Sequence, residues 1–461
     1  MAVETSDIRH EQLAASIRGT VVLPGDDAYA EARRVYNRMI DRHPAMIVEC
    51  ADAADVITAL HFARDAGWPI SVRAGGHSVP GFSTNDDGMV IDLAPMRNVH
   101  IDPARKVATV GGGATWGDVD HAAWSFGLVT PGGVVSTTGV TGLGLGGGFG
   151  HLTRRFGLVV DNMLGADVVT ADGELVYTSE RENPDLFWAI RGGGGNFGIV
   201  TRLELALHPV PGMYGGPIFY PVSAVTEVLP FYVDFIDHAP RELSAFFAFV
   251  VAPSAPFVPE VLWGHTACAI VVSWSGDPSG AEAAVRPVRE AGPVALDLAG
   301  PIPYPALNGM FDALHPRGHQ HYWKSDYMRE LSDEAIAVHE RYGPQVPNPM
   351  SIAHIYPLNG AVQDVRPEAT AFSYRDVDFV HIIGGVDPDS DRMPERRAWT
   401  QEYWSALHPF SAKGAYVNFM MEEGSDRIRA TYRENYPRLR DAKRRWDPGN
   451  VFRMNQNIAP D

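Results

Sequence analysis

One histidine, His77, stands in a sequence context that favours covalent chemistry. It follows the expected strand PISVR at 69–73 and the pair Gly75–Gly76, so few neighbouring side chains obstruct its ring. Near neutral pH an imidazole is mostly uncharged, and one ring nitrogen keeps a lone pair that can attack an electrophilic carbon. A lone histidine is more often structural, so this interpretation depends on what the surrounding sequence binds.

Three clusters of glycine indicate what that ligand is. They occupy residues 74–76, 132–150 and 192–198, and nine of the nineteen residues in the second cluster are glycine. We expect no helix and no central strand in that cluster, because glycine loses much conformational entropy on folding. Loops of this kind let backbone N–H groups face a diphosphate, and amide dipoles bind such an anion without net positive charge. The clusters therefore predict a dinucleotide site.

Two common nucleotide motifs do not account for these glycines. Gly142, Gly144 and Gly147 match the spacing GxGxxG, but the cluster continues as Gly-Gly-Phe-Gly-His rather than as a helix-forming run. A Rossmann fingerprint needs a strand before the glycines and a helix opened by them, so NAD binding through this motif is disfavoured. No GxxxxGK[ST] motif occurs in the sequence, which argues against a P-loop nucleotide triphosphatase.

Composition argues against several other classes. The 461 residues include 38 basic and 56 acidic side chains, and the formal charge of -18 disfavours nucleic acid and anionic membrane surfaces as partners. Cys50 and Cys268 lie far apart in apolar stretches, which predicts buried thiols. The polar start MAVETSDIRHEQ lacks a signal-peptide pattern, and no apolar run reaches about 18 residues. We expect a cytoplasmic protein with two packed units.

The elements around His77 alternate between helix and strand. A helix with Asp52 at its start and Gly67 at its end precedes the strand that leads to His77. Thr115 starts another helix, and Asp172-Gly173 predicts a hairpin. Further expected elements are a helix over 28–42 and strands over 89–93, 106–113 and 201–210.

The composition of the chain changes near Pro209, where glycine clusters give way to aromatic strands and amphipathic helices. FFAFVV and AIVVSW are strand-like, and residues 281–290 and 332–343 have helical spacing. The expected segments are a first domain at 1–208, a second domain at 209–410, and a C-terminal segment at 411–461 that returns to the first domain.

Four runs of sequence, in order along nearly the whole chain, resemble one enzyme family. They are RAGGHSVPGFS, TPGGVVSTTGVTGLGLGGGFGHLTRRFGLVVDN, ENPDLFWAIRGGGGNFGIVT and WDPGNVFRMNQNI. These runs resemble the berberine bridge enzyme group of FAD-linked oxidases, within the vanillyl-alcohol oxidase superfamily. The resemblance implies an α+β, two-domain fold: an FAD-binding domain of the vanillyl-alcohol oxidase (PCMH) type and an antiparallel-sheet substrate-binding domain.

The resemblance also implies which residues hold FAD. His77 matches the histidine that bonds the 8α-methyl group of the flavin. The loops that wrap the diphosphate match Arg73, Ala74, Gly75, Gly76, Ser78, Ser136, Thr137, Thr138, Gly139 and Gly142. Backbone contacts toward the adenine half match Gly198, Ile199 and Val200, and the segments that line the isoalloxazine contain Tyr416, Asn418, Asn455 and Gln456.

Two positions depart from patterns of other members. Plant-type and sugar-oxidising members carry a second linkage from a cysteine; Val135 stands there, so FAD would be linked through His77 alone. Many carbohydrate oxidases of the group read Tyr-x-Asn-Tyr near the C-terminus, with the last tyrosine as base. This chain has Phe419 at that position, and phenylalanine has no proton to exchange, so sugar oxidation by that arrangement is disfavoured.

Candidate catalytic residues come from the C-terminal segment and from polar positions on otherwise apolar strands. They are Tyr416, His354 with Tyr356 on its face, Tyr322 and Lys324. The strand residues are about as consistent with satisfied polar groups in an ordinary strand. The histidines at 315, 319 and 321 have no acidic or cysteine partner nearby, so we expect no metal site there.

These features predict an oxidase of small molecules. The substrate would lose a hydride to flavin N5 and a proton to a base, and dioxygen would reoxidise the flavin with release of hydrogen peroxide. The expected substrate is an alcohol or amine carbon of a small, partly aromatic natural product. A carbohydrate oxidase, a flavin-binding protein without turnover and a nicotinamide-dependent flavin reductase are the alternatives. The expected assembly is a monomer or a homodimer.

Overall fold

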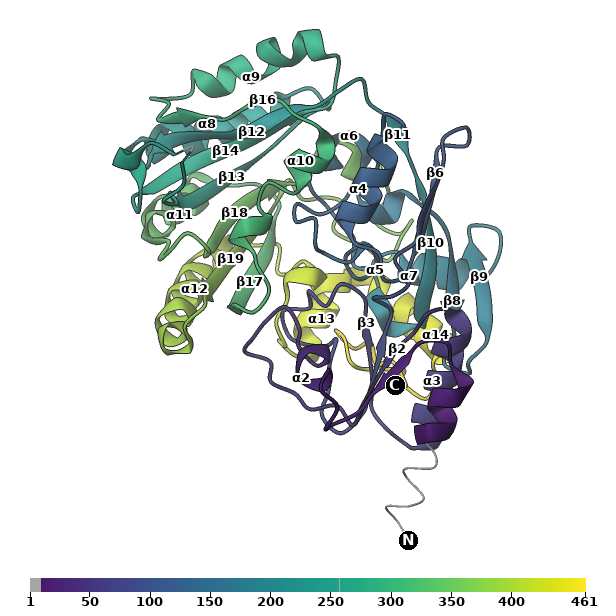
Figure 1. Ribbon diagram of the computed structural model, residues 1–461. Coiled ribbons are helices and arrows are strands. Elements are labelled where there is room, and N and C mark those ends of the chain that lie inside the picture. The colour runs from purple at the N-terminus through teal and green to yellow at the C-terminus, as the bar shows by residue number, and fades with distance from the viewer. Residues whose placement is uncertain (1–9, 257) are drawn as a thin grey trace.

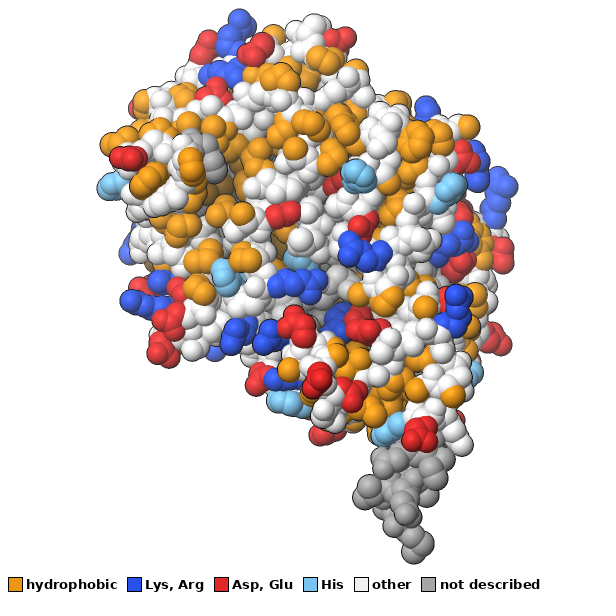
Figure 2. Space-filling model, viewed as in Figure 1, with side chains coloured by type: hydrophobic (Ala, Val, Ile, Leu, Met, Phe, Trp, Pro, Cys, Tyr) orange, Lys and Arg blue, Asp and Glu red, His pale blue; other side chains and the backbone are white. Residues whose placement is uncertain are grey.

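A computed structural model describes residues 10–256 and 258–461. Figure 1 shows the N-terminal part, in purple and blue, beside the yellow C-terminal part, with the green and teal middle of the chain in a separate layer. Acidic and basic side chains lie intermixed over the lower half of the face in Figure 2. No described helix is long and apolar enough to cross a membrane. The domain boundaries drawn from the sequence stay a prediction.

The first sheet ends at the loop that carries His77. Its four strands, in order, are β1 (Thr20–Val22), β2 (Met46–Glu49), β4 (Met89–Asp92) and β3 (Ile70–Arg73). β2, β4 and β3 run parallel, so their carboxyl ends meet at one edge. There Arg73 donates to Asp92 at 2.6 Å, and both are buried. The preceding helix α3 (Ala53–Asp65) starts as predicted, with the Asp52 carboxylate accepting two backbone N–H groups.

A second sheet of five antiparallel strands supports the other two glycine clusters. Its order is β5 (Val99–Asp102), β6 (Val107–Gly111), β10 (Ile199–Ala206), β8 (Met163–Val169) and β9 (Leu175–Ser179). Gly173, with a positive φ of 82°, forms the predicted turn between β8 and β9. Helix α4 (Trp116–Trp124) has the predicted capping box of Thr115 and Asp118. The short strands β7 (Leu128–Val129) and β11 (His208–Pro209) pair beside this sheet.

The middle of the chain forms the predicted antiparallel sheet, which has eight strands. Its main order is β15 (Leu296–Asp297), β12 (Tyr214–Pro221), β14 (Thr266–Trp274), β13 (Leu243–Val251), β18 (Ile352–Pro357), β19 (Phe379–Asp387) and β17 (Gln320–Met328), with β16 (Gly300–Pro301) beside β12. Helices α8 (Val225–His238), α9 (Ala281–Arg289), α11 (Asp333–Tyr342) and α12 (Met393–Leu407) lie in this part. Phe247 packs in a core with α8, whereas Phe246 packs in a core shared with the first part of the chain. One face of the sheet is therefore available to the glycine loops.

The C-terminal helices return to the first part of the chain. α13 (Ser425–Tyr432) precedes α14 (Tyr436–Trp446), which packs on α7 (Pro184–Ile190). Figure 1 shows α13 and α14, in yellow, next to the purple and blue elements. The short helix α6 (Thr153–Phe156) packs on β13, and α10 (Tyr304–Asn308) packs on α4.

Two predictions about local structure were wrong. The helix expected over 28–42 is only α2 (Tyr29–Ala32), because the following residues bond to distant segments instead: Tyr36 N–H donates to Gly76 and Arg38 N–H donates to His319. The second glycine cluster contains a short helix, α5 (Val140–Leu145). A Cβ on Gly144 would lie 3.1 Å from Val159, so close packing there favours glycine despite its low helix propensity.

Candidate active site

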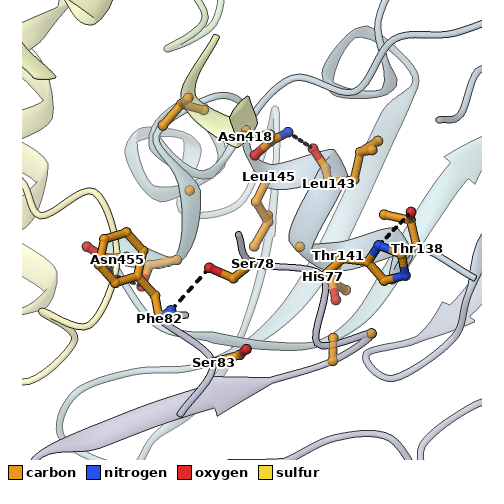
Figure 3. Close-up of a pocket in the computed structure, with 18 of the residues that line it drawn as sticks. His77, Ser78, Phe82, Ser83, Thr138, Thr141, Leu143, Leu145, Asn418 and Asn455 are labelled. Atoms are coloured by element: carbon orange, nitrogen blue, oxygen red, sulfur yellow. Dashed lines mark hydrogen bonds between the residues drawn. The ribbon is translucent and has the colours of Figure 1, made fainter. Parts of the chain in front are cut away.

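All three glycine clusters line one cavity of about 350 Å³. The C-terminal segment and strands β17, β18 and β19 supply a further part of its wall. Figure 3 shows part of this lining, with His77 and Ser78 on one loop and Asn418 and Asn455 on the C-terminal segment. The described lining contains no aspartate, glutamate, lysine or arginine. A ligand here would be held by backbone dipoles and apolar walls.

The His77 loop touches the second glycine cluster through its backbone. A Cβ on Gly75 would lie 2.3 Å from the nitrogen of Gly139, and one on Gly139 would lie 2.5 Å from the nitrogen of Gly75. Gly76 has a positive φ of 69°, which favours glycine. Glycine at these positions thus brings His77 against the neighbouring loop.

Two hydroxyl groups orient the His77 ring. Its Nε2 lies 3.0 Å from Oγ1 of Thr137, and its Nδ1 lies 3.4 Å from Oγ1 of Thr138. Burial, followed by the nearby charge of Arg317, lowers the pKa of His77 to about 3. The imidazole is therefore neutral at physiological pH and keeps a lone pair, as a nucleophile requires.

Unpartnered amides and open space mark where an anion fits. The backbone N–H groups of Gly76, His77 and Ser78 have no protein acceptor among the described residues. Gly142 lies in the first turn of α5 and lines the cavity, and a Cβ there would meet nothing within 4 Å. Amides without protein partners beside a side-chain-free surface suit a diphosphate.

The third glycine cluster is tied to the C-terminal segment. Asn196 donates from Nδ2 to the Gln456 carbonyl at 3.2 Å, and its Oδ1 accepts from the Ile458 N–H at 2.9 Å. Nε2 of Gln456 in turn donates to the carbonyls of Met420 and Met421. These bonds hold the chain end against the cavity.

Tyr416 connects the C-terminal segment to the second glycine cluster. Its hydroxyl oxygen accepts from the Gly148 N–H and from Nδ2 of Asn418, both at 2.7 Å. Asn418 also donates to the Leu143 carbonyl at 2.9 Å, a bond drawn in Figure 3. Burial raises the pKa of Tyr416 well above its usual range. Tyr416 therefore stays protonated and serves to hold the loops together.

One end of the cavity is largely aromatic and contains a hydrogen-bonded polar pair. Nδ1 of His354 lies 2.9 Å from the hydroxyl of Tyr356, and both side chains project from the same face of β18. Burial lowers the pKa of His354 to about 3. The ring of Phe149 lies 5.2 Å from that of Tyr356 and 5.6 Å from that of Phe419. Trp323 and Phe311 also line this end.

Comparisons with known proteins agree with this geometry. The family described as FAD binding domain matches residues 44–179, and the family described as berberine and berberine like matches residues 415–459. (R)-6-hydroxynicotine oxidase of Paenarthrobacter nicotinovorans is 31% identical, over 97% of this chain and 98% of that protein. An FAD-linked oxidoreductase of Bacillus subtilis is also 31% identical, over 96% and 97% of the two chains. The chain is a berberine bridge enzyme-like FAD-linked oxidoreductase.

The crystal structure of 6-hydroxy-D-nicotine oxidase from Arthrobacter nicotinovorans superposes on this FAD-linked oxidoreductase with a TM-score of 0.85 and 28% identity, over 97% of this chain and 99% of that one. A xylooligosaccharide oxidase from Myceliophthora thermophila has a TM-score of 0.84 at 24% identity, over 98% and 99% of the two chains, and so shares the fold. These likenesses confirm the predicted α+β FAD-binding fold with its antiparallel sheet.

The residues of this FAD-linked oxidoreductase fit FAD. The unpartnered amides at 76–78 and the open surface at Gly142 suit the diphosphate, while the apolar end offers room for a flat ring system. Most of the expected cofactor residues line the cavity: Ala74, Gly75, Gly76, His77, Ser78, Val135, Thr138, Gly139, Gly142, Gly198, Ile199, Val200, Asn418, Asn455 and Gln456.

Three expected cofactor residues act next to the cavity instead. Arg73 is occupied by Asp92 and by the Ala32 carbonyl. The backbone N–H and hydroxyl of Ser136 both donate to Asp312. Thr137 contacts His77. These residues shape the two loops without lining the cavity.

Two of the four candidate catalytic residues, Tyr322 and Lys324, lie outside the cavity, which corrects the expectation that they act on a substrate there. Tyr416 and His354 line it, but Tyr322 and Lys324 project from the opposite face of β17, because side chains alternate along a strand. Tyr322 accepts from Nε2 of Gln401, and Lys324 pairs with Glu423 at 3.0 Å. Trp323, between them, lines the cavity and was not predicted.

Sequence reasoning also missed Tyr36 and Phe149. Tyr36 lies in the segment expected to be helical, and it lines the cavity. Phe149 stands inside the second glycine cluster, where a single large side chain is the signal that could have drawn attention to it. Of the three neighbouring histidines, His315 lines the cavity, while His321 is fully buried beside it.

Proposed function

We propose that this enzyme carries FAD bonded to His77 alone and oxidises an alcohol or amine carbon of a small, partly aromatic molecule. The observation that carries the proposal is one cavity lined both by the His77 ring, which contacts Thr137, beside unpartnered backbone amides, and by aromatic side chains that include the His354–Tyr356 pair. Bound FAD would accept a hydride from the substrate carbon and pass the electrons to dioxygen, giving hydrogen peroxide.

The chain's own groups would hold the cofactor without a cationic side chain. The amides of residues 76–78 and of the first turn of α5 would bind the diphosphate, and glycines at 194, 195 and 198 would allow close approach of the adenine half. A ring nitrogen of His77 would bond the flavin 8α-methyl carbon. Val135 offers no thiol for a second bond.

His354 is the proposed proton acceptor. With its Nδ1–H donating to the Tyr356 oxygen, its Nε2 keeps a lone pair for the substrate O–H or N–H proton. The low pKa of about 3 keeps the ring neutral before substrate binds. Tyr416 is less suited, because its buried hydroxyl already accepts two hydrogen bonds and its pKa is raised.

The aromatic end favours a flat and largely apolar substrate. Phe149, Trp323 and Phe419 offer ring faces and edges there, and the described lining provides no carboxylate. A sugar would bring several hydroxyl groups that need hydrogen-bond partners. Among the described residues at this end, polar atoms come from His315, His354, Tyr356 and Nε1 of Trp323, and the rest of the surface is largely aromatic. The name of the 31% identical relative, (R)-6-hydroxynicotine oxidase, points the same way.

Peroxide release over a substrate panel tests this proposal. The panel contains aromatic alcohols, secondary amines on aromatic heterocycles, and oligosaccharides, and each is also added anaerobically to observe bleaching of the flavin. We expect bleaching and peroxide with members of the first two groups. Turnover of oligosaccharides alone would replace the proposal by carbohydrate oxidation, and bleaching by NADH or NADPH alone would replace it by a reductase activity.

A further inference from the structure

The ring of Tyr36 lies between two imidazoles. Its centroid is 4.3 Å from that of His77, with 18° between the planes, and 4.3 Å from that of His321, with 27°. Tyr36 is 2% exposed and belongs to the irregular segment after α2. The His77 ring therefore stacks on a side chain that is distant in sequence.

The middle part of the chain holds Tyr36 in place through backbone bonds. The Gly318 N–H donates to the Tyr36 carbonyl at 3.2 Å, and the Tyr36 N–H donates to the Gly76 carbonyl at 3.0 Å. Segment 315–321, whose end forms the start of β17, thus binds the carbonyl of Tyr36, and the His77 loop binds its N–H group.

Asn37 completes this connection with its side chain. Its Nδ2 donates to the carbonyls of Val79, at 2.7 Å, and His321, at 3.0 Å, and its Oδ1 accepts from the His321 N–H at 2.9 Å. Asn37 is fully buried, so these bonds are shielded from water. The guanidinium of Arg317 also donates to the Gly75 carbonyl. The position of Tyr36 consequently depends on contact between the two parts of the chain.

His321 contributes ring contacts rather than hydrogen bonds. It is fully buried, and neither ring nitrogen has a partner among the described residues. Its ring meets Tyr36 on one side and the edge of Trp323 at 5.7 Å. Burying an imidazole without hydrogen bonds costs free energy. The described contacts of the His321 ring are with the rings of Tyr36 and Trp323, so we assign it the role of packing against Tyr36.

We propose that Tyr36 is a positioning residue for flavin attachment. Hydrogen bonds to segment 315–321 hold Tyr36 in place, and its stacked ring fixes the plane of the His77 ring. The covalent bond therefore forms only when the first and middle parts of the chain are in contact. The proposal rests on the linkage at His77. Attachment joins a ring nitrogen to the 8α carbon; nitrogen and carbon each lose a hydrogen, and dioxygen takes up the two hydrogens with their electrons as hydrogen peroxide. Small misplacements of a reacting atom can slow such a step about 10²-fold.

The test follows attachment rather than turnover. Wild type and the Tyr36→Leu, Tyr36→Phe and Phe235→Leu variants, each prepared without flavin, are incubated with excess FAD. Flavin retained after acid precipitation is measured over time, beside total bound flavin after gel filtration. Tyr36→Phe keeps the ring, and Phe235→Leu removes a stacked ring of α8 that does not line the cavity. We expect these two to attach flavin at the wild-type rate, and Tyr36→Leu at least about tenfold more slowly at equal total bound FAD.

Attachment by Tyr36→Leu at the wild-type rate would overturn the proposal. If Tyr36→Leu does not fold, Asn37→Ala is tested instead, because it removes the side-chain hydrogen bonds of Asn37 to Val79 and His321 but keeps the Tyr36 ring. Slow attachment in Asn37→Ala supports the proposal, and attachment at the wild-type rate contradicts it. Failure of the underlying linkage is distinguishable. In that case wild-type protein would itself release all its flavin in acid, whereas failure of the Tyr36 proposal alone leaves wild type fully attached.

Discussion

Lys443 and Asp447 form a completely buried ion pair at the end of α14, with Nζ and Oδ2 2.7 Å apart. Nζ of Lys443 also donates to the carbonyls of Asn196 and Phe452, and Asp447 accepts the backbone N–H groups of Val451 and Phe452. The pair thus joins the third glycine cluster to the loop before Asn455 and Gln456. Asp447 is the aspartate of the sequence run WDPGN, and these contacts give it a structural role.

Substitution Lys443→Met should strongly destabilise the protein. Removing one member of a buried pair leaves the other charge without compensation, at a cost of roughly 3–5 kcal/mol in the free energy of unfolding. The midpoint of urea unfolding measures this change. Arg34→Met removes one member of an exposed pair, Arg34 with Glu31, and should cost less than about 1 kcal/mol. Equal midpoints for the two variants would contradict the structural role of Lys443.

Substitutions at Gly142 should affect folding and flavin content in opposite directions. Alanine favours a helix over glycine by about 1 kcal/mol, and a Cβ there meets no protein atom within 4 Å, so Gly142→Ala should stabilise the flavin-free chain. The same methyl group projects toward the proposed diphosphate. Bound flavin per protein, read from absorbance, should therefore fall in Gly142→Ala and further in Gly142→Val.

Gly117→Ala is the matched control for Gly142. Gly117 lies in helix α4, and a Cβ there would meet Ser136 at an ordinary 3.4 Å without lining the cavity. Its flavin content should equal that of the wild type. Full flavin content in Gly142→Val would mean that the diphosphate does not pass this surface.

Loss of His354 should lower kcat much more than it raises KM. Positioned general bases contribute about 10²–10⁴ in rate, so His354→Ala should lose a factor in this range, and Tyr356→Phe, which only orients the ring, should lose less. Steady-state peroxide release with the best substrate gives both constants. Tyr322→Phe is the control, because Tyr322 lies on the opposite face of the sheet. A larger loss in Tyr322→Phe than in His354→Ala would reverse the assignment.

Buried histidines should make the protein less stable as the pH is lowered. His381 is fully buried, neither ring nitrogen has a partner among the described residues, and burial lowers its pKa to about 4. The unfolded chain binds a proton at this histidine below about pH 6.5, while the folded chain stays neutral until about pH 4. Stability is therefore complete above the unfolded pKa and lost as pH falls, at up to about 1.4 kcal/mol per pH unit.

His381→Leu removes this proton linkage and keeps an apolar side chain of similar size. Urea midpoints at pH 7.5 and pH 5 should differ less in the variant than in the wild type. The loss in the free energy of unfolding between these pH values should be smaller by up to about 1.4 kcal/mol for each pH unit below about pH 6.5. An unchanged pH dependence would show that the pKa of His381 does not differ between the folded and the unfolded chain.

The sequence could predict those parts of the site whose structure depends on residues close by in the chain. The strand before His77 and the Asp52 and Thr115 caps depend on nearby residues, and they appear where expected. The faces of β17 could not be chosen, because HQHYWKSDY places polar groups on both. The Tyr36 segment has helical spacing, but bonds to Gly76 and to segment 315–321 replace the helix. Such distant partners leave no local signal.

The mass of the denatured protein tests the central claim most directly. Wild-type protein and His77→Ala are purified, precipitated with acid and weighed by mass spectrometry, and the peptide that contains residue 77 is then sequenced by fragmentation. The account predicts a yellow wild-type pellet whose mass exceeds the chain by one FAD less two hydrogens, with the adduct on His77, and a colourless variant pellet. A wild-type chain of unmodified mass, or an adduct that persists in His77→Ala, would contradict it.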